Sequence, residues 1–136
     1  MNFSPNLLAI LTVTIVNMIL GSLWYSLLFG KQWKVEMGFT PEIMQSMKMT
    51  AKRAYLLATL VGFISAYVFA HFAEYAGAKN ILDGLQFGFW AWLGFPMPII
   101  LGSVLWENKS WSLFWINVVY YLASFLIMGA LFAVWR

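Results

Sequence analysis

The chain has 136 residues, of which 62% are hydrophobic and 10% are charged, and its net charge is +3. An ordinary soluble domain carries about 25% charged residues, so this composition excludes a typical water-soluble fold and favours a chain that lipid solvates. The sequence has no cysteine, which excludes disulfides, thiolate nucleophiles and cysteine-ligated metal centres. The basic residues gather mainly in one segment, which indicates membrane orientation and argues against nucleic-acid binding.

Four runs of the sequence lack Asp, Glu, Lys and Arg and are long enough to cross a membrane. They predict transmembrane helices near residues 7–29, 54–73, 84–106 and 111–135. About 20 apolar residues in a helix cross the hydrocarbon core, which is roughly 30 Å thick. Residues 1–136 are therefore predicted to form a single all-α domain, an integral membrane four-helix bundle.

The long connection between the first two spans predicts a further helix near residues 41–52. Thr40 suits an N-cap, Pro41 the first helical position and Glu42 the positive end of the helix dipole. Apolar and polar side chains then fall on opposite faces, which is typical of a helix lying on a membrane surface. We expect a cytoplasmic amphipathic connector, and a sensor of lipids or partners is the alternative.

The basic residues of the connections predict how the chain is oriented. Six of them fall on one side of the membrane: Lys31, Lys34, Lys48, Lys52, Arg53 and Lys109. The opposite side carries only Lys79 and Arg136. Because cytoplasmic loops carry the excess of Lys and Arg, both termini are predicted to be non-cytoplasmic, in a multi-pass protein of the bacterial inner membrane.

Small residues recur at four-residue spacing on two of the predicted spans. The second span carries Ala58, Gly62, Ala66 and Ala70, and the third opens with Gly84 and Gly88. This spacing lets helix backbones approach closely in a membrane, so these six positions are predicted to pack against other helices. With four short helices per chain, we also expect some of these surfaces to serve a homo-oligomer or a partner in a membrane complex.

Two prolines in the middle of the third span predict a break in the helix. Pro96 and Pro98 lack backbone donors, so the carbonyls one turn earlier, near Trp92 and Gly94, lose their helical hydrogen bonds. Broken helices line binding cavities in transporters. The alternative is a structural kink that neighbouring side chains fill.

Polar and aromatic side chains inside the spans form the predicted ligand site. Asparagine is unfavourable in lipid, so Asn17 and Asn117 are expected to face the protein interior. The full set of predicted site residues is Asn17, Trp24, Tyr25, Trp92, Pro96, Asn117 and Tyr121. Aromatic rings would form the walls of the site, and the two amides would orient polar groups. The alternative is that these side chains only form hydrogen bonds between helices.

The stretch NMILGSLWYSLLFGKQWKVEMG, residues 17–38, resembles the signature of a family of small bacterial membrane proteins, domain of unknown function 1761. The closing segment WSLFWINVVYYLASFLIMGAL, residues 111–131, is similar to the last helix of that family. The positions that match the motif are Trp24, Tyr25, Gly30, Lys31 and Trp33. The resemblance implies a shared fold with four spans and supplies no activity. Within the motif, Gly30 suits a turn that ends the first helix.

No arrangement of residues in the sequence predicts catalysis. There is no nucleophile with its base and acid, no phosphate-binding loop and no buried pair of carboxylates, so an enzyme is not expected. His71 and Glu74 alone are a poor ligand set, and neither a metal nor a cofactor is expected. The leading hypothesis is a protein that binds or conducts a small neutral or amphipathic molecule within the membrane. The alternatives are an accessory subunit of a larger membrane complex and a protein that organises lipids.

Overall fold

The computed structural model describes residues 3–135, and within that range every regular element is helical. Four segments are long and apolar enough to cross a membrane: Leu7–Leu28, Ala51–Tyr75, Ile81–Trp106 and Trp111–Val134. The shortest has 22 residues, which is about 33 Å of helix and matches a hydrocarbon core of roughly 30 Å. The all-α prediction is confirmed, and the four apolar segments indicate a multi-pass membrane protein.

The four long apolar segments begin at capping side chains. In chain order the elements are α1 (Leu7–Leu23), η1 (Trp24–Leu28), α2 (Gly30–Glu36), α3 (Pro41–Ser46), α4 (Ala51–Tyr75), α5 (Ile81–Gly94), α6 (Pro96–Trp106) and α7 (Trp111–Val134). The four caps that start the long segments are Asn6, Thr50, Asn80 and Ser110. Each accepts a backbone N–H of the first turn, an interaction that contributes about 1 kcal/mol.

The first span is not α-helical to its end. η1 is a turn of π-helix, in which the Phe29 N–H donates to the Trp24 carbonyl, five residues earlier, at 2.9 Å. α2 follows directly, so Gly30 begins a helix and does not end one as the sequence predicts. The reason is steric, because a Cβ at position 30 would lie 2.9 Å from the Tyr25 carbonyl oxygen. Glycine is the residue that fits inside this wide turn.

The third span is broken at its prolines. α5 ends at Gly94 and α6 begins at Pro96, and Phe95 between them has φ −116° and ψ −75°. The Phe95 N–H still donates to the Ala91 carbonyl at 3.0 Å, but Pro96 has no N–H with which to continue the series. The two halves therefore meet at a hinge formed by one non-helical residue.

The connection between the first two spans holds a shorter helix than the one predicted near residues 41–52. Thr40 caps α3 as expected, but α3 ends at Ser46 and residues 47–50 are not helical. The interruption arises because the Thr50 hydroxyl accepts the Arg53 N–H at 3.3 Å and so starts α4 as a separate helix.

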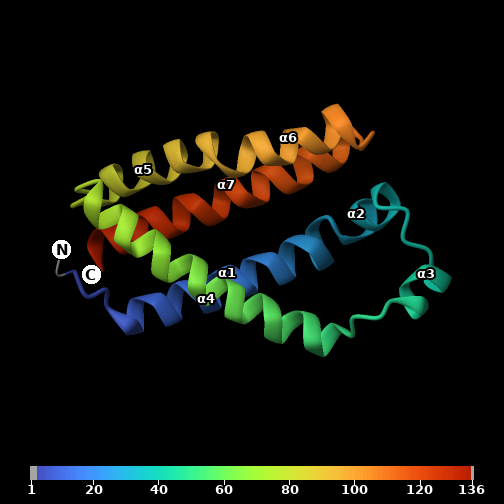
Figure 1. The fold of residues 1–136 in the computed structure, drawn as a ribbon, viewed down its shortest axis with the longest axis horizontal. Helices are drawn as coiled ribbons and strands as arrows, with labels where there is room; N and C mark the ends of the chain where they lie inside the picture. Colours follow the sequence, from blue (N-terminus) through green and yellow to red (C-terminus); the bar gives the residue numbers. More distant parts are fainter. Residues whose placement is uncertain (1–2, 136) are drawn as a thin grey trace.

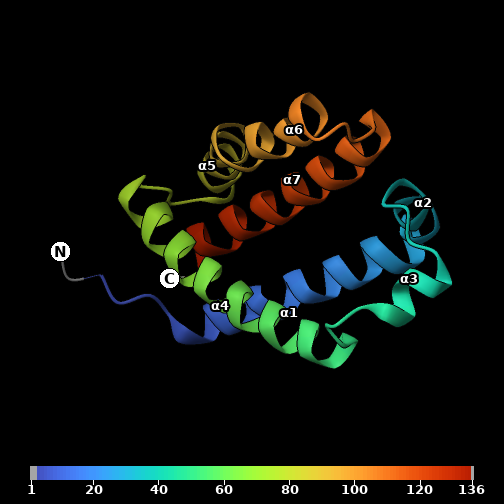
Figure 2. The same ribbon diagram turned by 45° about the vertical axis from the view of Figure 1, so that its right-hand side comes forward.

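α7 is the central helix of the arrangement. Figures 1 and 2 show α1 and α4 crossing on one side of α7, while α5 and α6 run along its other side. Successive spans run in opposite directions. α4 diverges from α7 toward the end of the molecule that carries α2 and α3, so the helices are closest near the two termini.

Glycines bring the backbones of α5 and α7 into contact. Gly84 of α5 lies against Gly129 of α7, and Gly88 lies against the Phe125 carbonyl. A Cβ at any of these three glycines would collide with backbone atoms of the facing helix. This close approach maximises dispersion contacts where no hydrophobic driving force acts between helices.

The small residues of α4 have different environments along the helix. Ala66 and Ala70 are buried in the core that α4 forms with α1 and α7. Gly62 faces Thr14 of α1, because a Cβ at position 62 would lie 3.7 Å from the Thr14 methyl carbon. Ala58, the first of the series, is exposed. The stripe therefore leaves the packed core as α4 diverges from α7.

The basic side chains of the described residues gather at one end of the molecule, which we call the basic end. Figure 1 shows that α2, α3, the start of α4 and the turn between α6 and α7 lie there, opposite both termini. The six basic residues on these segments are Lys31, Lys34, Lys48, Lys52, Arg53 and Lys109. Lys79 lies in the turn between α4 and α5, and Arg136 lies outside the described residues.

Candidate functional site

A series of polar contacts joins the first span and α2 to α7. The pairs are Asn17 with Ser124, Tyr25 with Asn117, Gln32 with Ser112 and Glu36 with Ser110, and we call them the polar ladder. From pair to pair the residue number rises in the first span and α2 and falls toward the start of α7, because the two segments run in opposite directions. The polar ladder therefore runs from the middle of the spans to the basic end.

The two inner pairs of the polar ladder lie within the apolar spans. The Ser124 hydroxyl donates to the Asn17 side-chain oxygen at 3.0 Å, and the Tyr25 hydroxyl donates to the Asn117 side-chain oxygen at 2.8 Å. In hydrocarbon such groups have no water to bind, so each pair satisfies atoms that would otherwise be unpaired.

The π-turn directs two neighbouring side chains at α7. The Trp24 indole N–H donates to the Ile116 carbonyl at 2.9 Å, while Tyr25 binds Asn117. Neighbouring side chains of a regular α-helix diverge by about 100°, and the extra residue in a π-turn reduces this divergence. Consecutive residues of the first span consequently contact consecutive residues of α7. Single π-turns inside α-helices are frequently found at functional sites.

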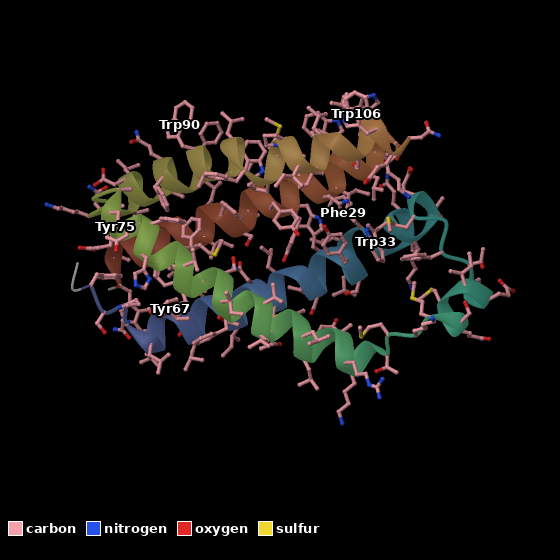
Figure 3. All side chains as sticks on the ribbon, viewed as in Figure 1. Phe29, Trp33, Tyr67, Tyr75, Trp90 and Trp106 are labelled. Carbon is pink, nitrogen blue, oxygen red and sulfur yellow. The ribbon has the colours of Figure 1, made fainter. Side chains whose placement is uncertain are left out.

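Aromatic rings surround this junction. Tyr25 packs edge-on against Tyr120, with ring centroids 5.1 Å apart, and against Trp33 at 5.5 Å. Trp24 packs against Phe29 at 4.9 Å. Figure 3 shows Phe29 and Trp33 near each other where the first span gives way to α2. The aromatic residues of the motif are thus held by one another as well as by the polar ladder.

A pocket of about 270 Å³ opens beside the polar ladder, between the first span, α4 and α7, and we call it the polar pocket. Its lining residues are Asn17, Met18, Gly21, Ser22, Tyr25, Ser26, Ala54, Tyr55, Ala58 and Tyr120. None of these side chains is Asp, Glu, Lys, Arg or His. Pockets for drug-sized ligands usually measure about 300–1,000 Å³, so the polar pocket suits a smaller molecule.

Several polar groups at the polar pocket keep hydrogen-bonding capacity. Within residues 3–135, the Tyr120 hydroxyl and the Asn17 amide nitrogen have no hydrogen-bond partner. Gly21 makes room for that hydroxyl, because a Cβ at position 21 would lie 3.0 Å from the Tyr120 oxygen. The Ser22 hydroxyl donates to the Tyr55 hydroxyl at 3.3 Å, a long contact. The polar pocket therefore offers donors and acceptors without a net charge.

The structure brings together part of the predicted ligand site. Asn17 and Tyr25 border the polar pocket, and Asn117 is linked to it through its bond with Tyr25. Trp24 precedes Tyr25 in the sequence, but its indole N–H donates to the main chain of α7 and the residue does not line the polar pocket.

The other predicted site residues lie elsewhere. The Trp92 indole N–H donates to the Val118 carbonyl at 2.9 Å, which joins α5 to α7. Pro96 lies at the hinge of the third span. Tyr121 is exposed, and its ring packs edge-on against Tyr120 at 5.1 Å. The sequence indicates the depth of these residues in a span, and only helix packing determines which way each one faces.

Four polar side chains that line the polar pocket are absent from the predicted ligand set: Ser22, Ser26, Tyr55 and Tyr120. Tyr120 adjoins the predicted site residue Tyr121 in the sequence. Tyr55 falls in the predicted second span, near residues 54–73, and the structure places it in α4, where its hydroxyl accepts from Ser22 of the first span. One feature of the sequence could have indicated that Tyr120 borders the site: a small residue, Gly21, lies on the first span at the same depth as this tyrosine on the fourth span.

The ionisable groups of the described residues do not form a metal site. Within residues 3–135, no three His, Asp or Glu side chains lie close enough to hold a metal ion. His71, the only histidine of the sequence, has its Nδ1 atom 2.9 Å from the Tyr67 carbonyl and its ring 4.6 Å from the Tyr67 ring. The surroundings of His71 are thus aromatic.

Comparison with known proteins assigns the chain to a family. A family model described as protein of unknown function (DUF1761) matches residues 8–133. Neither the curated proteins nor the solved structures contain a match to the chain. The matched range covers the π-turn, the polar ladder and all four apolar segments except the end residues Leu7 and Val134. The chain therefore belongs to the DUF1761 family, as the stretch around Trp24 and Tyr25 predicts.

Proposed function

We propose that this protein is a non-enzymatic, multi-pass protein of the bacterial inner membrane that binds or conducts a small neutral or amphipathic molecule in the polar pocket. The observation that carries the proposal is the unused hydrogen-bonding capacity of Tyr120 and Asn17 within an apolar span region. Polar groups are unfavourable in hydrocarbon unless they have partners. A ligand with its own donors and acceptors would supply those partners.

The chemistry of the lining defines the ligand class. The polar pocket has hydroxyl and amide groups and no ionisable acid or base apart from tyrosine, so it favours a neutral molecule over an ion. The rings of Tyr25 and Tyr120 add flat apolar walls. A small amphipathic molecule would place its polar atoms toward Asn17 and its apolar part against these rings.

The charge distribution supports an orientation for this site. The six basic residues of the basic end favour the cytoplasmic side, so both termini would be non-cytoplasmic. The polar pocket lies in the half of the first span nearer the basic end. A ligand would then reach it from the cytoplasm or from the cytoplasmic leaflet.

The test is native mass spectrometry of the protein extracted gently from its own membrane. We expect a reproducible small-molecule adduct on the wild-type protein and its loss from Tyr120→Phe, which removes one hydroxyl from the polar pocket. Tyr121→Phe is the matched control, because it removes the neighbouring hydroxyl outside the pocket. The proposal is overturned if the wild type carries no adduct, or if both variants retain it equally.

An accessory subunit of a larger membrane complex is the second candidate. The third span supports it, because almost none of that span is buried within the chain. Figure 3 shows Trp90 and Trp106 projecting from the outer face of α5 and α6, and Trp106 is 86% exposed. A second copy of the chain or another subunit would cover this face. The same mass spectrum distinguishes them, because a homo-oligomer and a heteromer have different masses.

A further inference from the structure

A second and larger cavity, of about 580 Å³, lies between α4, α5 and α7, and we call it the aromatic cavity. Its volume falls in the usual range for ligand pockets, about 300–1,000 Å³. The lining residues that matter most are Ser65, Phe69, Phe72, Phe87, Phe95 and Phe125. The aromatic cavity shares no lining residue with the polar pocket, so binding there is independent of the proposed function.

The lining of the aromatic cavity is enriched in one residue type. It holds five of the twelve phenylalanines of the chain. Leucine and isoleucine are abundant in all four spans, yet neither contributes to this lining. An unbranched hydrocarbon chain would be held as well by aliphatic side chains. Aromatic rings add edge-to-face and offset-stacked contacts that favour another flat ring.

The rings are arranged as a floor and a rim. Phe69 forms the floor, being 6% exposed, and it packs edge-on against Phe87 at 5.0 Å and Phe125 at 5.3 Å. Phe72 of α4 and Phe95 at the hinge of the third span form the rim and are 57% and 70% exposed. The break at the prolines thus places an exposed ring at the mouth of the aromatic cavity.

Ser65 is the one lining residue with a polar side chain. Thr14 and Thr59, in the neighbouring turns of the spans, each donate to a carbonyl four residues earlier at 2.8 Å. Within residues 3–135, the Ser65 hydroxyl has no such partner. A donor in an apolar span therefore remains available to a bound molecule.

We infer that the aromatic cavity binds a planar, mainly apolar ring compound that carries a carbonyl or hydroxyl group. The rings of the floor and rim would contact its faces and edges, and the Ser65 hydroxyl would donate to its oxygen. The aromatic cavity lies beside the hinge of the third span and its rim rings are exposed on apolar segments, so such a compound would enter from the bilayer.

The experiment measures saturable binding of radiolabelled 1,4-naphthoquinone to the full chain in lipid nanodiscs, with empty nanodiscs subtracted. We expect Phe87→Leu and Phe95→Leu to weaken binding by about threefold to tenfold, which corresponds to the loss of one aromatic contact. Phe95 is an exposed rim residue, so its replacement leaves the fold intact. Phe89→Leu is the control, because it removes a ring of α5 outside the cavity.

Two competitors test the ring and the hydrogen bond separately. Naphthalene, which has no oxygen, is expected to lose no affinity in Ser65→Ala, whereas naphthoquinone loses about threefold to tenfold. Dodecanol, an unbranched chain with one hydroxyl, is expected to compete poorly. The inference is overturned if naphthoquinone shows no saturable binding, if Phe89→Leu weakens it as much as Phe87→Leu, or if dodecanol displaces it equally well.

Discussion

Single polar side chains hold the first span against the fourth. Asn17 and Ser124 face each other across an otherwise apolar contact, and their hydrogen bond measures 3.0 Å. In the membrane such bonds contribute about 0.5 to 1.5 kcal/mol, since the unfolded chain in lipid also finds partners. The main effect of this bond is therefore to determine which faces of α1 and α7 meet, and its contribution to the stability of the fold is small.

The first prediction concerns the energy of this bond. In a double-mutant cycle of Asn17→Ala and Ser124→Ala, we expect a coupling energy of about 0.5 to 1.5 kcal/mol. The free energy of unfolding is measured by titration with a denaturing detergent in mixed micelles. Asn17→Ala combined with Ser103→Ala is the control and should be additive, because Ser103 donates to the Ile100 carbonyl of its own helix. Zero coupling between Asn17 and Ser124 would contradict the role given to the bond.

At the scale of the elements, glycine determines how closely the third and fourth spans approach. Gly84, Gly88 and Gly129 leave no room for a Cβ between α5 and α7. Gly102 of α6, in the same span as Gly88, has open space where its Cβ would be. Two glycines of one span thus have opposite structural roles, and the spacing of small residues alone does not separate them.

The second prediction uses that contrast. Gly88→Ala is expected to destabilise the protein by about 1–3 kcal/mol, because α5 and α7 must separate to admit the methyl group. Gly102→Ala is expected to be neutral or to stabilise by up to about 1 kcal/mol, since alanine is the better helix former. Detergent-induced unfolding monitored by circular dichroism gives both values. Equal effects of the two substitutions would show that the α5–α7 contact is not close in the folded protein.

The sequence predicts the number and position of the long helices better than it predicts irregular turns and exact helix ends. The uncharged runs and the paired prolines indicate four apolar helices and a break in the third, because charge and missing donors act locally. The π-turn at Trp24 has no comparable local signal, and the early end of α3 depends on competition between the Thr50 cap and a continuous helix. The phenylalanines of the aromatic cavity resemble lipid-facing residues in the sequence, and only the packing of α4, α5 and α7 brings them together.

The third prediction tests the π-turn. Gly30→Ala is expected to destabilise the protein by about 1–3 kcal/mol, because its Cβ would lie against the Tyr25 carbonyl oxygen. Gly94→Ala is the control, because a Cβ there meets nothing within 4 Å. The measurement is the same detergent titration. An unchanged free energy of unfolding in Gly30→Ala would mean that the turn relaxes to an ordinary α-helix at no cost.

At the scale of the whole molecule, the two ends differ in their charge and in how closely their helices pack. The termini and the buried core share one end, and the basic residues and the polar pocket lie toward the other. Many large apolar side chains remain exposed along the spans. Lipid, a second copy or a partner would cover them, which is consistent with a membrane environment.

The last prediction assigns the two ends to the two sides of the membrane. The sequence has no cysteine, so Lys48→Cys, Lys109→Cys and Lys79→Cys each introduce a single reactive thiol. In intact spheroplasts, a membrane-impermeant maleimide is expected to label Lys79→Cys at once. It should label the other two only after permeabilisation, because the basic end is expected to face the cytoplasm. The reverse pattern would invert the orientation and place the polar pocket toward the outer leaflet, leaving its hydrogen-bonding chemistry unchanged. Labelling of all three thiols in intact cells would mean that the chain does not cross the membrane as four spans.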